Sequence, residues 1–234
     1  MDLDQLREEQ RYLASQIESP TESVWLVPHS IVFGVDIQYV EDTAFVAMAA
    51  YNMKGNLLET FVFKTGAGME YHPGYFCFRE GPPLLRMIRK IIATQNLIPD
   101  VLLIDGHGVA HPRQLGVASY IGLKTNIPTI GIAKRALLPY EGELDIARGS
   151  QLPIYKHNSE RQKVSNEMVG VVLRTQDDVK PVFISSGYEV PLHQAINLTL
   201  QFSDPYRICN PIRTADHAAR AYAKGENLPG VIIL

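Results

Sequence analysis

The chain has 234 residues, of which 46% are hydrophobic and 20% charged, and this composition is typical of a globular protein. We expect a single domain over residues 1–234, although length alone also allows two small domains. A net charge of −3 leaves no basic surplus, so the composition neither indicates nor excludes a nucleic-acid partner. No run of about 18 apolar residues could cross a membrane, and the acidic start MDLDQLREEQ is unlike a secretory leader. Cys77 and Cys209 match no metal-binding spacing, which predicts free thiols in a reducing, cytoplasmic setting.

The first part of the chain predicts a helix and three strands. Residues 3–17 place their apolar side chains on one helical stripe. Apolar runs at 30–39, 44–51 and 58–64 are joined by short polar turns, which is typical of an antiparallel meander.

A loop and an alternation of helices and strands follow. Residues 66–83 hold four glycines and three prolines, a composition typical of a shaped loop, and its last prolines open a helix at 82–95. A buried strand at 101–104, a helix at 112–124 and a strand at 128–133 come next. This alternation implies parallel pairing of the strands.

The last part of the chain predicts further elements beyond a polar, non-periodic segment at 139–166, which we interpret as a surface excursion. Strands are expected at 168–174 and 181–185, and helices at 191–201 and 211–224. A meander followed by alternating helices and strands favours an α/β fold with a mixed five-stranded sheet flanked by helices, of the ribonuclease H-like type. A flavodoxin-like sheet is the fallback.

Two acidic residues interrupt apolar strands. Asp36 lies within GVDIQY, where a buried carboxylate is costly unless it is paired, bound to metal or satisfied by backbone amides. Asp105 ends VLLID, and the carboxyl ends of strands are where α/β proteins place their sites, although a turn Asp before Gly is also common. Together the two acids form a minimal arrangement for binding Mg²⁺.

Two further acids are candidates on weaker grounds. Glu80 stands in FREGPP at the entry to a helix, where it could equally complement the helix dipole. Asp216 lies among alanines of the last helix, which implies close packing and a confined space or a site around the carboxylate. The alternative for Asp216 is a surface pair with Arg213 or Arg220 on the same helix.

The segment DGHGVAHPRQLG carries the densest signal. His107 and His111 follow Asp105 closely, and a histidine beside a carboxylate-bound metal can donate a proton or orient water. The alternative is a pair of turn histidines that cap a helix. Lys134 ends TIGIAK, where it can neutralise a phosphate at the same edge of the sheet.

These segments resemble the endonuclease V family. The resemblance rests on GVDIQY, PGYFCFREGPPLL, PDVLLIDGHGVAHPRQLGVASYIGL, IPTIGIAK and PIRTADHAAR, and it is close over residues 30–135 and looser beyond. It implies a ribonuclease H-like fold and a metal-dependent endonuclease that acts in the repair or processing of deaminated adenine. The expected reaction is hydrolysis of the second phosphodiester bond 3′ to deoxyinosine or inosine in DNA or RNA, which leaves a 5′-phosphate and a 3′-hydroxyl.

The resemblance also implies roles for individual residues. The expected ligands of Mg²⁺, which Mn²⁺ can replace, are Asp36, Glu80, Asp105 and Asp216, and family members carry either His or Asp at the last position. The expected catalytic residues are Asp36, Glu80, Asp105, His111 and Lys134. The expected nucleic-acid-binding residues are Tyr71, Pro73, Gly74, Arg79 and Gly116. The expected partner is inosine-containing DNA or RNA, with no membrane, bound by a monomer.

One motif departs from the family pattern. The strand-separating wedge usually reads Pro-Tyr-Ile-Pro, whereas this chain has Glu70-Tyr71-His72-Pro73. Tyr71 and Pro73 keep an aromatic wedge, but Glu70 adds negative charge near the expected path of the phosphates, which bears on duplex handling and on the preference between DNA and RNA.

Two other classes of function fit the sequence less well. A non-catalytic reader of inosine in RNA would not need four intact carboxylates. A phosphotransferase of the same fold that binds ATP would need a glycine-rich loop directly after the first strand, where this chain has Ile37-Gln38-Tyr39-Val40.

Overall fold

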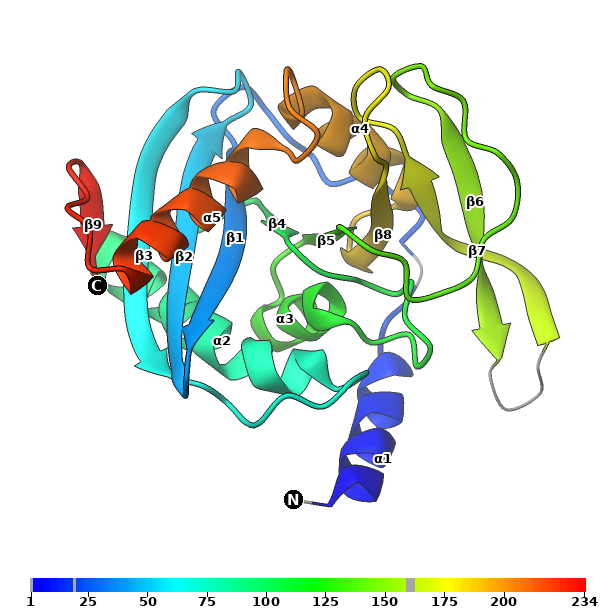
Figure 1. The fold of residues 1–234 in the computed structure, drawn as a ribbon, viewed down its shortest axis with the longest axis horizontal. Coiled ribbons are helices and arrows are strands. Elements are labelled where there is room, and N and C mark those ends of the chain that lie inside the picture. The colour runs from blue at the N-terminus through cyan, green and yellow to red at the C-terminus, as the bar shows by residue number, and fades with distance from the viewer. Residues whose placement is uncertain (1, 19, 159–162) are drawn as a thin grey trace.

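The computed structural model of the chain describes residues 2–18, 20–158 and 163–234. Its centre is a nine-stranded sheet in the order β6-β7-β8-β5-β4-β1-β2-β3-β9 (Figure 1). The strands are β1 (Ile31–Val40), β2 (Thr43–Asn52), β3 (Leu57–Gly66), β4 (Val101–Ile104), β5 (Thr129–Ala133), β6 (Gln151–Asn158), β7 (Lys163–Leu173), β8 (Val182–Tyr188) and β9 (Val231–Ile233). The helices are α1 (Leu3–Ala14), α2 (Phe76–Gln95), α3 (Val117–Thr125), α4 (Leu192–Phe202) and α5 (Asn210–Ala223).

Five neighbouring strands confirm the predicted ribonuclease H-like arrangement. Strands β1, β2 and β3 form the antiparallel meander, and β4 and β5 join in parallel on the other side of β1. The sheet has nine strands rather than the expected five, because β8, β7 and β6 extend one edge and β9 extends the other. Strand β6 lies within residues 139–166, which we expected to be irregular. It is an edge strand whose described side chains are mostly partly or fully exposed, so its sequence lacks a continuous apolar run.

Two helices begin away from their predicted positions. Helix α2 starts at Phe76, ahead of the predicted start, and contains Pro82 and Pro83. Pro83 has no N–H to donate to the carbonyl of Arg79, and the hydroxyl of Tyr39 donates to that oxygen instead at 3.4 Å. Helix α3 starts later than predicted, because the segment before it turns through Gln114, which has a positive φ of 58°.

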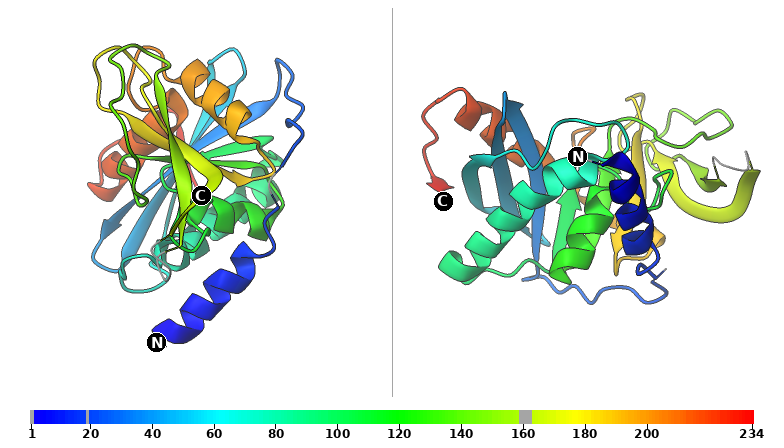
Figure 2. Two further views of the ribbon diagram at one scale, coloured as in Figure 1. Left: turned by 90° about the vertical axis from the view of Figure 1, so that its right-hand side faces the viewer. Right: turned by 90° about the horizontal axis from the view of Figure 1, so that it is seen from below.

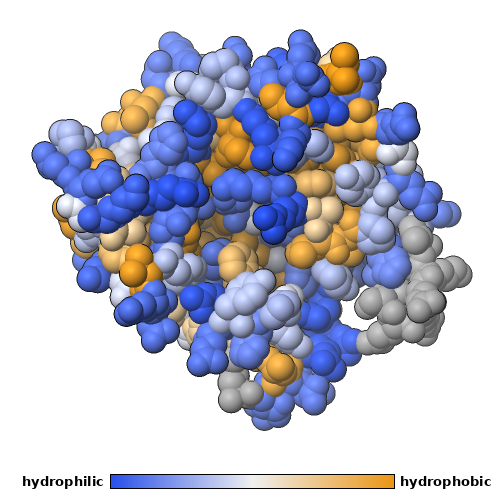
Figure 3. Space-filling model, in the orientation of Figure 1, coloured by the Kyte–Doolittle hydropathy of each residue, from blue (hydrophilic) through white to orange (hydrophobic). Residues whose placement is uncertain are grey.

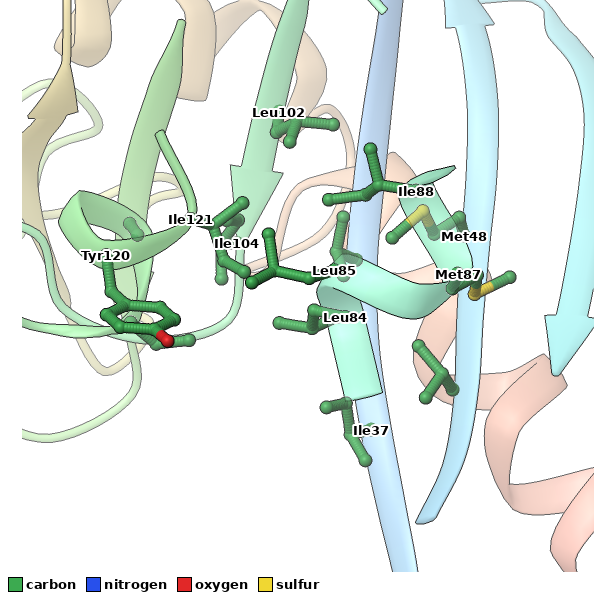
Figure 4. Packing of buried hydrophobic residues seen from close by; sticks show 14 of the residues in the cluster. Ile37, Met48, Leu84, Leu85, Met87, Ile88, Leu102, Ile104, Tyr120 and Ile121 are labelled. Atoms are coloured by element: carbon green, nitrogen blue, oxygen red, sulfur yellow. The ribbon is translucent and has the colours of Figure 1, made fainter. Parts of the chain in front are cut away.

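The helices cover the sheet on both sides. Figure 2 shows α5 on one side of the strands, with α2 and α3 on the other. On the α2 side, Leu84, Leu85 and Ile88 pack toward Ile104 and Ile121 (Figure 4). Burial of each such side chain stabilises the fold by roughly 1.5–3 kcal/mol. Cys77 and Cys209 are buried free thiols, as predicted. No helix in the described part of the chain has the length and apolarity needed to cross a membrane.

Helix α5 packs directly on the backbone of the central strand. A Cβ atom at Gly34 would lie 1.9 Å from the carbonyl carbon of Pro211, so no larger residue fits there. Because side chains alternate along a strand, Asp36 lies on the same face as Gly34. This close approach brings Asp216 of α5 to the face of the sheet that holds Asp36.

Candidate active site

The two strand acids lie side by side, as their positions in the sequence predicted. Val35 of β1 pairs with Ile104 of β4 in parallel register, so the next residues of the two strands, Asp36 and Asp105, are neighbours. Asp36 is only 8% exposed, and Nε2 of Gln38 donates a hydrogen bond to its carboxylate at 3.3 Å. Gln38 follows two residues after Asp36 on the same face of β1, a spacing that could have revealed it in the sequence.

Glu80 completes a cluster of buried negative charge. It lies in the second turn of α2 and is 7% exposed. Burial raises the pKa of Glu80 well above its usual value, and the charges of Asp36 and Asp105 raise it further. Burial likewise raises the pKa of Asp36 to about 8, with contributions from Asp105 and Asp216. Asp36 therefore lies within electrostatic reach of Glu80, Asp105 and Asp216, and burial disfavours the charged forms of Asp36 and Glu80.

Lys134 partly offsets the negative charge of these carboxylates. Lys134, directly after β5, forms an ion pair with Asp105. Burial alone would lower the pKa of Lys134, but Asp105, Asp36 and Asp216 outweigh burial and raise it. Within the described ranges, no three His, Cys, Asp or Glu side chains are placed so that they could together hold a metal ion as they stand.

Asp216 pairs with an arginine of its own helix and also lies near the other carboxylates. Its two carboxylate oxygens each accept a hydrogen bond from Nε of Arg220 at 2.9 Å, which is the predicted pair along the helix. The side chain is nevertheless only 18% exposed, and its charge raises the pKa of both Asp36 and Lys134. Asp216 thus faces the carboxylate cluster while it is held by Arg220.

His111 is buried and His107 is half-buried, and both are neutral near neutral pH. Burial lowers the pKa of His111 to about 3, and Arg113 and His107 lower it further. Nδ1 of His111 accepts a hydrogen bond from the backbone N–H of Arg113 at 3.1 Å. Burial also lowers the pKa of His107 to about 4, and its Nε2 donates to the carbonyl of Arg135 at 2.9 Å. Near neutral pH, His111 therefore offers hydrogen bonds rather than a positive charge.

A cavity of about 320 Å³ opens beside Asp105, and we call it the first cavity. Its lining residues are Tyr71, Gly74, Phe76, Cys77, Asp105, Gly106, His107, His111, Gly116, Val117, Ala133, Lys134, Arg135 and Leu137. Phe76, Arg135 and Leu137 were not predicted for this site, because nothing in their local sequence pattern indicates a cavity wall.

Glycines let the backbone form the wall of the first cavity. A Cβ atom at Gly116 would lie 2.1 Å from the carbonyl oxygen of His107. Gly74 has a φ of 83°, in the left-handed region, and its carbonyl accepts a hydrogen bond from Nη2 of Arg113 at 2.6 Å. Both predicted pocket glycines thus lie where only a glycine fits without strain.

Of the remaining predicted residues, Tyr71 lines the first cavity, whereas Pro73 and Arg79 do not. Tyr71 is 61% exposed at its rim and meets the ring of Phe76 edge-on, with centroids 6.0 Å apart. Pro73 follows in the same loop. The guanidinium of Arg79 lies over the ring of Tyr39 and donates to the carbonyl of Met69 at 2.6 Å, so it anchors this loop without lining the cavity.

Comparison with known proteins places this geometry in a family. The family model for endonuclease V matches residues 11–217. This chain belongs to the endonuclease V family. Endonuclease V of Dictyoglomus thermophilum is 38% identical over 186 residues, which cover 79% of this chain and 76% of the relative. The enzyme is accordingly an endonuclease, and the alternative of a non-catalytic reader is set aside.

Solved structures of the family have the same fold. Endonuclease V from Streptomyces avermitilis superposes with a TM-score of 0.82 at 31% identity, covering 95% of this chain and 93% of the other. Endonuclease V from Ciona intestinalis superposes with a TM-score of 0.80 at 25% identity, covering 95% and 98%. The latter structure is a complex with a 24mer DNA containing an inosine followed by a ribo-adenosine.

Proposed function

We propose that this endonuclease V family member hydrolyses the second phosphodiester bond 3′ to an inosine, in DNA or RNA, and leaves a 5′-phosphate and a 3′-hydroxyl. The observation that carries the proposal is the adjacency of the first cavity to the carboxylate cluster, since Asp105 belongs to both. An extruded base needs a pocket that the backbone approaches closely, and Gly74 and Gly116 supply such a wall. A base held there brings its own strand to the carboxylates.

The carboxylate cluster has the chemistry of a divalent-cation site, and its side chains would have to move closer together to hold the ion. Asp36, Glu80, Asp105 and Asp216 would hold Mg²⁺, with Mn²⁺ as a substitute, because carboxylate oxygens are the ligands these ions prefer. The pKa values of Asp36 and Glu80 are raised mainly by burial and further by the neighbouring acids, and a bound cation would offset that acidic charge. Lys134 would have to release an oxygen of Asp105 to make room. When bound, such an ion lowers the pKa of a water molecule and stabilises charge on the phosphate.

The other predicted residues position the substrate. Lys134, once released from Asp105, neutralises charge on the phosphate at the edge of the sheet. His111 is neutral, so it donates or accepts a hydrogen bond within the first cavity. Tyr71, exposed at the rim, stacks against the space that the extruded base leaves, with Pro73 behind it.

A cleavage assay tests the proposal. Matched DNA and RNA strands that carry either one inosine or one adenosine are incubated with Mg²⁺, with Mn²⁺ or with EDTA, and the product ends are mapped. We expect one cut, at the second bond 3′ to inosine, in the presence of either ion and none in EDTA. Equal cutting of the adenosine strands would overturn the base specificity, and undiminished cutting in EDTA would overturn the metal assignment.

A further inference from the structure

A second cavity, of about 510 Å³, lies beside the carboxylate cluster and is absent from the predicted site. Its lining residues are Lys134, Tyr206, Arg207, Ile208, Arg213, Asp216, His217 and Arg220. It shares Lys134 with the first cavity, and its other residues come from α5 and from the segment before it. Figure 3 views the molecule from the side of α5 and shows hydrophilic side chains gathered over this helix.

Arg213 is the distinctive residue of the second cavity. Its guanidinium lies over the ring of Tyr206, 3.8 Å from the ring centroid. The side chain is half-buried, yet no carboxylate in the described part of the chain pairs with it, whereas Lys134 and Arg220 each hold an aspartate. A half-buried cation without an anionic partner is costly, and a phosphate group would supply that partner.

Arg207 gives the same cavity a fixed positive wall. Its Nε donates to the carbonyl of Lys180 at 2.8 Å, and its Nη2 donates to the carbonyl of Pro181 at 2.9 Å. These bonds neutralise no charge, because their acceptors are backbone carbonyls. The second cavity therefore combines the ring of Tyr206, which is 44% exposed, with two guanidinium groups that form no ion pair with any carboxylate of the described residues.

The arrangement of the two cavities gives the strand a direction. Asp105 lines the first cavity and Asp216 lines the second, so the acids that would act on the phosphate separate the two. If the base occupies the first cavity and the cut falls on its 3′ side, the strand passes over the acids and continues away from the base. The strand then reaches the second cavity.

We infer that the second cavity holds the strand on the 3′ side of the cut, with Arg213 on a phosphate and the Tyr206–Arg213 stack beneath a base. This inference rests on the proposed function. Stacking on an aromatic ring and contact with phosphates do not depend on base identity, so the cavity would accept any sequence. It would also hold the 5′-phosphorylated product until release.

The test is a series of single strands that carry one inosine, a constant 5′ part, and either about two or about eight nucleotides beyond the cut. For the native enzyme we expect kcat/KM to be about ten-fold higher on the longer strand, in line with the loss of one stacking and one phosphate contact on the shorter. Arg213→Gln and Tyr206→Ala should lower kcat/KM about ten-fold on the longer strand and leave the shorter strand nearly unchanged. Tyr206→Phe, which keeps the ring, should match the native enzyme.

Controls separate this role from a structural one. Arg89→Gln removes an exposed guanidinium from α2, on the other side of the sheet, and should change neither strand. Arg213→Gln should also reduce the slope of log K against log salt concentration by the amount expected for about one phosphate contact. Binding is measured with the longer strand in Ca²⁺. Thermal melting establishes that each variant is folded.

The outcomes are distinguishable. If the native enzyme does not cut at the second bond 3′ to inosine, the proposed function fails, and this inference fails with it. If the native enzyme cuts there but Arg213→Gln is equally impaired on both strand lengths, the proposed function stands and only the inference is overturned.

Discussion

Replacing Asp36 with asparagine separates a site residue from a structural one. If Asp36 served the fold, its loss would destabilise the protein. The structure gives the opposite expectation, because the carboxylate is buried beside Asp105 and Asp216 and, among the described residues, only the side chain of Gln38 donates a hydrogen bond to it. Asparagine has nearly the same shape and no charge. We expect Asp36→Asn to lose cleavage and to gain stability in the absence of divalent ions.

The pKa of Asp36 sets the size of the effect. It is about 8 in the folded chain, against an unperturbed value of 3.8. Between these values the unfolded chain ionises while the folded chain stays protonated, so the free energy of unfolding falls as the pH rises and levels off above the folded pKa. At pH 7 the accumulated loss is at most about 4 kcal/mol. Asparagine escapes this loss, but its amide N–H groups need new partners, at a cost of about 1–3 kcal/mol.

The net gain for Asp36→Asn at pH 7 is therefore about 1–3 kcal/mol, or roughly 2–12 °C in Tm for a chain of this size. The assay is thermal melting of both proteins in EDTA from about pH 4 to about pH 9, where the difference should grow with pH and then level off. Added Mg²⁺ should raise the Tm of the native protein more than that of the variant, because binding to the folded state adds stability. A variant that melts below the native protein at neutral pH in EDTA would refute the reasoning.

Three further outcomes are expected. Tyr71→Ala should weaken binding to inosine-containing strands, measured in Ca²⁺, by about 1–3 kcal/mol because stacking is lost. An unchanged Kd would show that Tyr71 only packs within its loop. Asp216→Ala should raise the metal concentration needed for half-maximal rate. Asp216→His should keep activity while favouring Mn²⁺ over Mg²⁺. If the metal titration of Asp216→Ala is unchanged, Asp216 serves only as a partner of Arg220. Gly116→Ala should lower the free energy of unfolding by about 1–3 kcal/mol, since its Cβ would press on the carbonyl of His107, and a native-like Tm would show that the loop can move aside.

Much of the candidate site was predictable from local sequence patterns. Asp36 and Asp105 were identifiable because a carboxylate inside or at the end of an apolar strand is conspicuous, and the register of β1 and β4 does place them side by side. Gly74 and Gly116 were identifiable only through the family motif, and their geometry now supplies the reason. The electrostatic influence of Glu80 and Asp216 on this cluster depends on how α2 and α5 pack, which no single segment encodes.

The sequence by itself determined the meander, the parallel strands that follow it, and the acids that these strands carry, because hydrophobic periodicity and strand ends are local properties. It misplaced the start of α2, where a hydroxyl from β1 satisfies the carbonyl that Pro83 leaves free, and it missed β6 and β9, which are edge strands. Only the tertiary structure revealed the second cavity. Tyr206, Arg207 and Arg213 become a surface when α5 packs against Gly34, and that contact joins residues far apart in the chain.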